Sequence, residues 1–99
     1  MTNDITYTLA DDGLAFYAYD HTRRIGEITF VRVGIDKIMI DHTHVDAAYD
    51  PHDIDAELVA HVVNLARQSH RHILCLCPRA RAIFNRTPAY DDVRLMNDH

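Results

Sequence analysis

The sequence predicts a mixed α/β (α+β) fold with its elements in the order ββββαβα. Segments rich in aromatic and β-branched residues, typical of strands, fill the first half of the chain. A helical spacing of apolar residues follows from Asp53 to Ser69. A short apolar run at 72–77 comes next, and then a segment opened by Pro78, a residue favoured in the first turn of a helix. This order of periodicities predicts one sheet with helices packed on it.

Four strands are expected before the first helix, at 5–9, 14–20, 24–33 and 37–45. Short turns at 11–13, 21–23 and 34–36 separate them, so consecutive strands should pair antiparallel as a meander. In the fourth strand, the two-residue period of a regular strand places four side chains on one face. They are Ile38, Ile40, His42 and His44.

The helix expected from Asp53 to Ser69 begins with Asp53 as a plausible N-cap and carries acidic residues in its first turn. Its apolar stripe consists of Ile54, Leu58, Val62, Leu65 and Ala66. The strand at 72–77 should lie parallel to the fourth strand, since a helix separates the two. The last helix, 78–85, should end before Thr87 and Pro88.

With 99 residues and no linker-like tract, the chain is expected to be a single domain, 1–99. A net charge of −5 argues against a nucleic-acid partner, because phosphate binding needs a basic face. No apolar run reaches the roughly 20 residues that span a bilayer. We therefore expect a cytoplasmic protein with neither a membrane nor a nucleic-acid partner. The sequence does not indicate an oligomeric state.

Charge is distributed unevenly along the chain. No Lys or Arg occurs from Ile38 to Ala66, and a cluster of arginines follows. These are Arg67, Arg71, Arg79, Arg81 and Arg86. If the two segments meet in the fold, opposite charges face each other.

Cys75 and Cys77 are too close in sequence to close a loop by a disulfide, so both are expected to be reduced. Cys77 stands just before the last helix, where the N-terminal dipole would stabilise a thiolate. Cys75 is interpreted as a small apolar core residue. For Cys77 a reactive thiol and a core residue are both open interpretations.

His42 and His44 could approach the two cysteines if their strands are neighbours, and two histidines with two cysteines would suit zinc. The H-x-H and C-x-C spacings differ from the usual gaps between zinc ligands, so no metal site is predicted.

The junction between the fourth strand and the helix has two interpretations. A helix N-terminus offers unpaired backbone N–H groups, which can hold a phosphate. Here, however, Pro51 removes one donor and nearby carboxylates would repel an anion. The acidic residues are Asp50, Asp53, Asp55 and Glu57. The alternative is a capped helix with an acidic, solvated start and no ligand.

From Leu14 to Val93 the sequence resembles the small, single-domain branch of the GNAT-type N-acetyltransferases. The "DHTHV" segment, the Cys-Pro pair and the closing "TPAYDDV" segment carry the resemblance. The matching residues are His42, Thr43, Val45, Tyr49, Leu58, Val59, Ala66, Cys77, Pro78, Pro88, Tyr90 and Asp92. The resemblance implies a sheet whose fourth and fifth strands part to admit the pantetheine arm of acetyl-CoA.

The function implied by this resemblance is acetyl transfer from acetyl-CoA to an unknown amine or thiol acceptor. The implied catalytic residues are Cys77 and, as its deprotonating partner, His44. The implied cofactor-binding residues are Thr43, His44, Val45, Ile54, Asp55, Ala56 and Cys77.

One segment departs from the family pattern. Relatives read approximately Y-R-G-x-G-apolar-G/A where this chain reads "YDPHDID" from Tyr49 to Asp55. The alternative to an enzyme is therefore a catalytically degenerate interaction module of the same fold that does not bind CoA.

Overall fold

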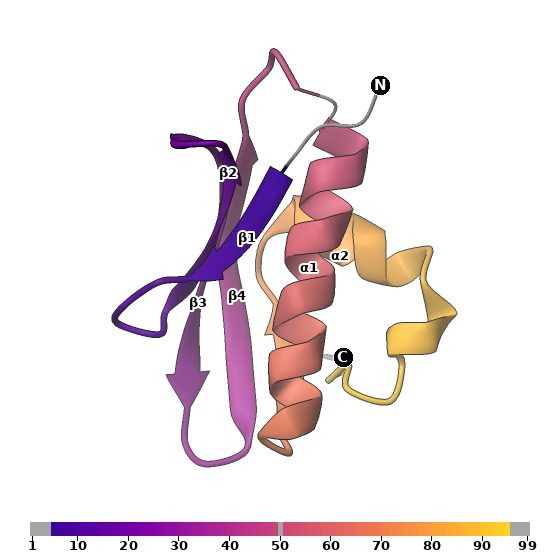
Figure 1. The fold of residues 1–99 in the computed structure, drawn as a ribbon. Coiled ribbons are helices and arrows are strands. Elements are labelled where there is room, and N and C mark those ends of the chain that lie inside the picture. Colours follow the sequence, from indigo (N-terminus) through magenta and orange to yellow (C-terminus); the bar gives the residue numbers. More distant parts are fainter. Residues whose placement is uncertain (1–4, 50, 96–99) are drawn as a thin grey trace.

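Five strands form one mixed sheet in the order β1-β2-β3-β4-β5, seen in Figure 1. The computed structural model describes residues 5–49 and 51–95, and of residues 51–53 only the backbone. The strands are β1 (Ile5–Leu9), β2 (Ala15–Asp20), β3 (Arg23–Val33), β4 (Lys37–Val45) and β5 (His72–Cys75). The first four pair antiparallel and β5 pairs parallel with β4, as the sequence predicts.

Two helices follow the two parallel strands. Helix α1 (Pro51–Gln68) connects β4 to β5, and α2 (Pro78–Asn85) follows β5. A short 3-10 turn, η1 (Pro88–Tyr90), leads to the last described residues. Figure 1 shows both helices on the same side of the sheet. The parallel strands β4 and β5 are each followed by a helix, so both helices begin at the end of the sheet where these two strands finish. Within residues 5–49 and 51–95, no helix is long and apolar enough to cross a bilayer.

The core lies between one face of the sheet and the two helices. Its largest fully buried side chains include Phe30, Ile38 and Ile40 from the sheet, and Leu58 and Phe84 from the helices. The opposite face of the sheet has no helix on it in the described part of the chain. We call this the open face. It carries partly buried or exposed side chains, among them Tyr17, Tyr19, Glu27, Met39, His42 and His44.

A β-bulge in β4 corrects one prediction. Ile40 pairs with Phe30 and His42 pairs with Thr29, so Asp41 is an extra residue without a partner on β3. An extra residue reverses the alternation of side chains beyond it. Consequently Thr43 and Val45 are buried on the helix side, like Ile38 and Ile40. His42 and His44 are exposed on the open face, and not on the face of Ile38 and Ile40 as predicted.

The ends of two elements also differ from prediction. Helix α1 begins at Pro51, so Asp53 lies inside its first turn and is not the N-cap. Proline is favoured in that turn because its missing N–H would have no partner there anyway. Strand β5 ends at Cys75 and not at Cys77. Helix α2 has the predicted bounds.

Candidate functional site

Strands β4 and β5 part at one end, and this parting defines the candidate site. Their parallel ladder runs from Lys37 and His72 to Ile40 and Cys75, and a last bond joins the Leu76 N–H to the Ile40 carbonyl at 2.9 Å. Strand β4 continues for five more residues to Val45. The bulge at Asp41 coincides with the end of β5, and the backbone ladder between the two strands stops there; we call this parting of the two backbones the gap.

The backbone of β4 presents a free edge to this gap. The Asp46 N–H donates to the Ile25 carbonyl on the β3 side at 2.8 Å. Because N–H groups alternate in direction along a strand, those of Val45 and Thr43 point the other way, toward the gap. Among the described residues, no strand pairs with this edge beyond Ile40. An extended ligand carrying amide groups could therefore pair with β4 there.

Cys77 lies beside the gap, between the end of β5 and the start of α2. Its side chain is buried, and its thiol donates to the Thr43 hydroxyl oxygen at 3.5 Å. The structure thus brings together two of the residues that the sequence singled out, Cys77 and Thr43. Cys77 is the N-cap of α2, and its sulfur lies near the first N–H groups of the helix without the geometry of a regular capping hydrogen bond.

The surroundings of Cys77 favour its thiolate. Burial has the largest single effect and raises the pKa of the thiol. The N–H groups of Ala80 and Arg79 and the hydroxyl and N–H of Thr43 outweigh it together, so the pKa lies below its ordinary value of 9.0. At Cys75 burial outweighs the opposing effect of the Arg94 and Arg81 charges, and it raises the pKa of the thiol to about 11. Of the two cysteines, only Cys77 has a thiol whose pKa is lowered.

His44 lies on the open face, away from the sulfur of Cys77. Its Nε2 is 3.5 Å from Asp46 Oδ1, and its ring stacks on that of His42 with 6.4 Å between the ring centroids. The bulge therefore separates His44 from Cys77. Sequence reasoning missed Asp46, whose spacing of two residues from His44 was the available signal.

The bulge also places the two histidines and the two cysteines on opposite sides of the sheet. Among residues 5–49 and 51–95, no three His, Cys, Asp or Glu side chains are grouped so that they could hold a metal ion.

The first turns of α1 border the gap. Ile54 is buried, and an atom placed as Cβ on Gly26 would lie 3.3 Å from its Cγ2. Gly26 pairs with Val45, so α1 starts against the end of β4. Asp55 is buried and Ala56 is half-buried. Asp50 and the side chains of 51–53, which complete the predicted acidic turn, lie outside what the structure describes.

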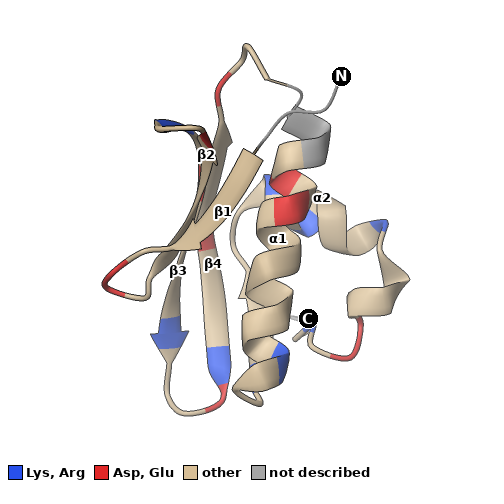
Figure 2. Cartoon of the chain, in the orientation of Figure 1, with Lys and Arg blue, Asp and Glu red and all other residues tan. Residues whose placement is uncertain are grey.

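Asp55 contacts a residue that the sequence analysis had not assigned to the site. Its Oδ2 lies 3.9 Å from Arg79 Nε on α2. Figure 2 shows the acidic start of α1 next to the basic start of α2. The uneven distribution of charge along the chain indicated that such segments could meet, but it did not identify the pair.

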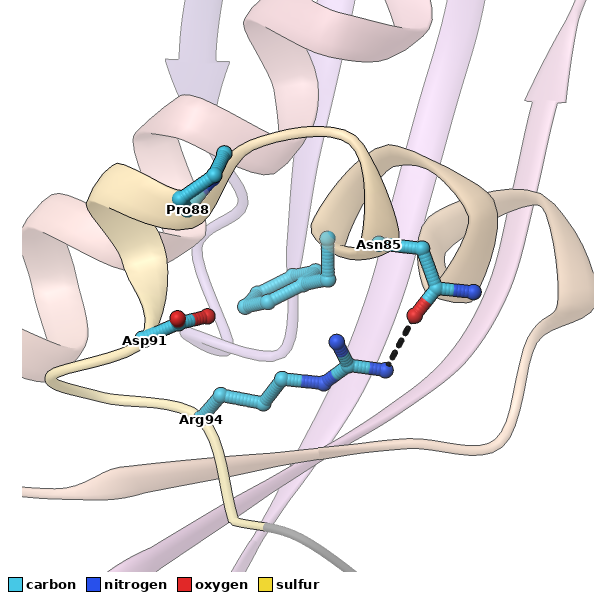
Figure 3. Close-up of a pocket in the computed structure, with 5 residues that line it drawn as sticks. Asn85, Pro88, Asp91 and Arg94 are labelled. Atoms are coloured by element: carbon cyan, nitrogen blue, oxygen red, sulfur yellow. Dashed lines mark hydrogen bonds between the residues drawn. The ribbon is translucent and has the colours of Figure 1, made fainter.

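A cavity of ≈450 Å³ lies between α2, η1 and the segment that follows, and Figure 3 shows its lining. Phe84, Asn85, Pro88, Asp91 and Arg94 line it, and Arg94 donates to Asn85 Oδ1 at 2.7 Å. Its wall is formed by the C-terminal end of α2, roughly 12 Å along the helix from Cys77. The five residues include no thiol, so the gap beside Cys77 is the better candidate for transfer by way of a thioester.

A mixed sheet whose β4 and β5 part beside the start of α2 is the arrangement that the resemblance in the sequence implies. Comparison with known proteins agrees. The family model described as GCN5-related N-acetyl-transferase matches residues 15–93. The chain therefore belongs to the GCN5-related N-acetyltransferase family.

Solved structures support the fold. The NMR structure of a GCN5-like protein from Staphylococcus aureus is 28% identical, with a TM-score of 0.76 over 100% of this chain and 95% of that one. A ribosomal-protein-alanine N-acetyltransferase from Brucella melitensis is 16% identical, with a TM-score of 0.66 over 86% of this chain and 63% of the other. A GNAT family acetyltransferase from Streptococcus pneumoniae is 13% identical, with a TM-score of 0.57 over 86% and 70%. No curated protein matches the chain.

Proposed function

We propose that this chain transfers an acetyl group from acetyl-CoA to an amine or thiol acceptor by way of Cys77. The observation that carries the proposal is the position of Cys77, whose pKa is lowered, beside the gap between β4 and β5. The edge of β4 at Val45 would pair with the amide-bearing arm of CoA, next to Thr43, whose N–H faces the sulfur of Cys77. Ile54, Asp55 and Ala56 would border the same arm where α1 begins.

In the proposed first step, the Cys77 thiolate attacks the acetyl carbonyl carbon. The bond from that carbon to the CoA sulfur breaks, and CoA leaves as a thiol with the proton that Cys77 gave up. Cys77 then carries the acetyl group. The acceptor attacks this second thioester, and Cys77 leaves as its thiolate. Thr43 assists both steps, because its hydroxyl can donate to the sulfur whenever the sulfur is negative.

We assign His44 to the acceptor, because it lies on the open face and Cys77 on the other side of the sheet. His44 would take a proton from an acceptor amine, and Asp46, 3.5 Å away, would stabilise the protonated ring. In this arrangement donor and acceptor approach the gap from different faces. The open face leaves room for the acceptor, since no described helix covers it.

The proposal is tested by incubating the protein with acetyl-CoA and measuring its mass before and after an amine is added. We expect one acetyl group on the wild-type chain and on Cys75→Ser, and none on Cys77→Ser. His44→Gln should still be acetylated but should lose the group to the amine more slowly, whereas His42→Gln should behave as wild type. Equal acetylation of Cys77→Ser would rule out Cys77 as the acyl carrier. A wild-type chain that neither binds CoA nor becomes acetylated would favour the degenerate interaction module.

A further inference from the structure

The contact between Asp55 and Arg79 contains a buried group whose hydrogen bonding is incomplete. Only 7% of the Asp55 side chain is exposed, compared with 42% of the Arg79 side chain. Asp55 Oδ2 faces Arg79 Nε at 3.9 Å, and Asp55 Oδ1 is buried with no hydrogen-bond partner among the residues that the structure describes. It is the one such side-chain atom found within the described part of the chain. A buried carboxylate oxygen left unpaired costs stability, so its retention calls for a reason.

This pair lies beside the gap. On one side, Asp55 follows Ile54, which packs on Gly26 where β3 pairs with the end of β4. On the other side, Arg79 is two residues beyond Cys77 at the start of α2. The contact thus joins the starts of both helices next to the proposed path of the acyl donor.

The guanidinium of Arg79 has N–H donors without a hydrogen-bond partner among the described residues. Its Nε faces Asp55, and the described residues supply no partner for its two terminal nitrogens. A guanidinium can hold a carboxylate on one side and present a pair of N–H groups to a phosphate on another. If the contact with Asp55 shortened when a ligand bound, both carboxylate oxygens could pair with the guanidinium, and Oδ1 would gain a partner.

We propose that Arg79, held in place by Asp55, binds the phosphate groups of the acyl donor. This inference rests on the proposed function, because it assumes that the donor lies in the gap. The need for such a cation follows from the sequence: the turn before α1 has no glycine, and it contains Pro51 and several acidic residues. Recognition of the phosphates therefore shifts from the backbone of that turn to a side chain of α2.

The test compares CoA with pantetheine, which has the amide-bearing arm but no phosphate. Affinity for CoA is measured by calorimetry, and weak binding of pantetheine by the protection it gives Cys77 from alkylation. Arg79→Gln should weaken CoA binding about 10- to 100-fold, the effect of losing a charge-assisted hydrogen bond, and leave pantetheine unchanged. The affinity of Arg79→Lys for CoA should lie between those of wild type and Arg79→Gln, since lysine keeps the charge but lacks the paired N–H donors of a guanidinium.

The matched control is Arg86→Gln, which removes the same charge from an exposed residue at the other end of α2. It should bind both ligands as wild type does. Asp55→Asn should weaken CoA binding less than Arg79→Gln does, because Asp55 acts by positioning Arg79.

The failures are distinguishable. If CoA binds equally well to Arg79→Gln and Arg86→Gln, the inference is wrong and the proposed function stands. The inference is also wrong if Arg79→Gln weakens the binding of CoA and of pantetheine equally, since Arg79 would then stabilise the site as a whole and not bind the phosphates. A wild-type chain that binds neither ligand overturns both.

Discussion

At the scale of single residues, the reactivity of Cys77 depends on the groups around its sulfur. Burial alone makes a thiol less acidic, as Cys75 demonstrates with a pKa of about 11. Cys77 differs because it caps a helix and touches Thr43, which together lower its pKa in spite of burial. Two cysteines only two positions apart thus have thiol pKa values shifted in opposite directions.

This contrast gives a prediction for pH dependence. In Thr43→Val the hydroxyl is lost while the side chain keeps its shape, so the thiolate of Cys77 loses one donor. The pKa of Cys77 should rise, and the pH midpoint of its alkylation rate should move upward from that of wild type. The rate is measured with a neutral thiol reagent in the Cys75→Ser background. Thr29→Val on the open face is the control and should leave the midpoint in place, and an unmoved midpoint in Thr43→Val would show that Thr43 does not stabilise the thiolate.

At the scale of elements, the sequence predicted the strands and helices well because each carries its own periodicity. The wide apolar stripe from Ile54 to Ala66 and the Pro78 start of α2 are local signals. The bulge at Asp41 is not a local signal, since an extra residue in a strand becomes visible only through pairing with β3. Its consequence is large, because it moves His44 to the face opposite Cys77. Similarly, the contact between Asp55 and Arg79 joins residues far apart in sequence, so only their opposite charges could be anticipated.

A second contact between elements joins α1 to the C-terminal segment. Arg67 Nε and Nη2 donate to the Asp92 carboxylate at 3.1 and 2.8 Å, and Nη2 also donates to the Ala89 carbonyl at 2.9 Å. The hydrogen bond from Arg67 is the main reason why the pKa of Asp92 lies below its ordinary value of 3.8. A two-point contact of this kind fixes the last segment to the helix better than a single ion pair.

The sign of the lowered pKa sets the pH range in which this contact stabilises the fold. A carboxyl group with a lower pKa in the folded state stabilises the protein above its unfolded pKa, near 4, and loses that effect as pH falls through the folded value. Asp92→Asn should therefore unfold at lower urea concentration than wild type at pH 7, with the difference shrinking below about pH 4. A difference that persists unchanged at pH 2.5 would indicate that the charge of Asp92 is not responsible.

At the scale of the whole molecule, one close approach determines where the layers meet. At Gly26, β3 pairs with the end of β4 on one side and lies under the start of α1 on the other. An atom placed as Cβ on this residue would lie 3.2 Å from the His44 carbonyl oxygen and 3.3 Å from Ile54 Cγ2. A glycine here lets the start of α1 pack closely on the sheet where β3 pairs with the end of β4.

Replacing this glycine should therefore affect stability and the site together. Gly26→Ala should lower the free energy of unfolding by about 1–3 kcal/mol, as an overpacked core does, because the neighbouring carbonyl is backbone and cannot turn aside. It should also weaken CoA binding, since α1 has to move away from the end of β4. Adding Ile54→Ala removes one of the two close contacts, so the double variant should lose less stability than the sum of the single variants. Urea unfolding of all four proteins measures this coupling, and strict additivity would mean that Gly26 does not control the distance between α1 and the sheet.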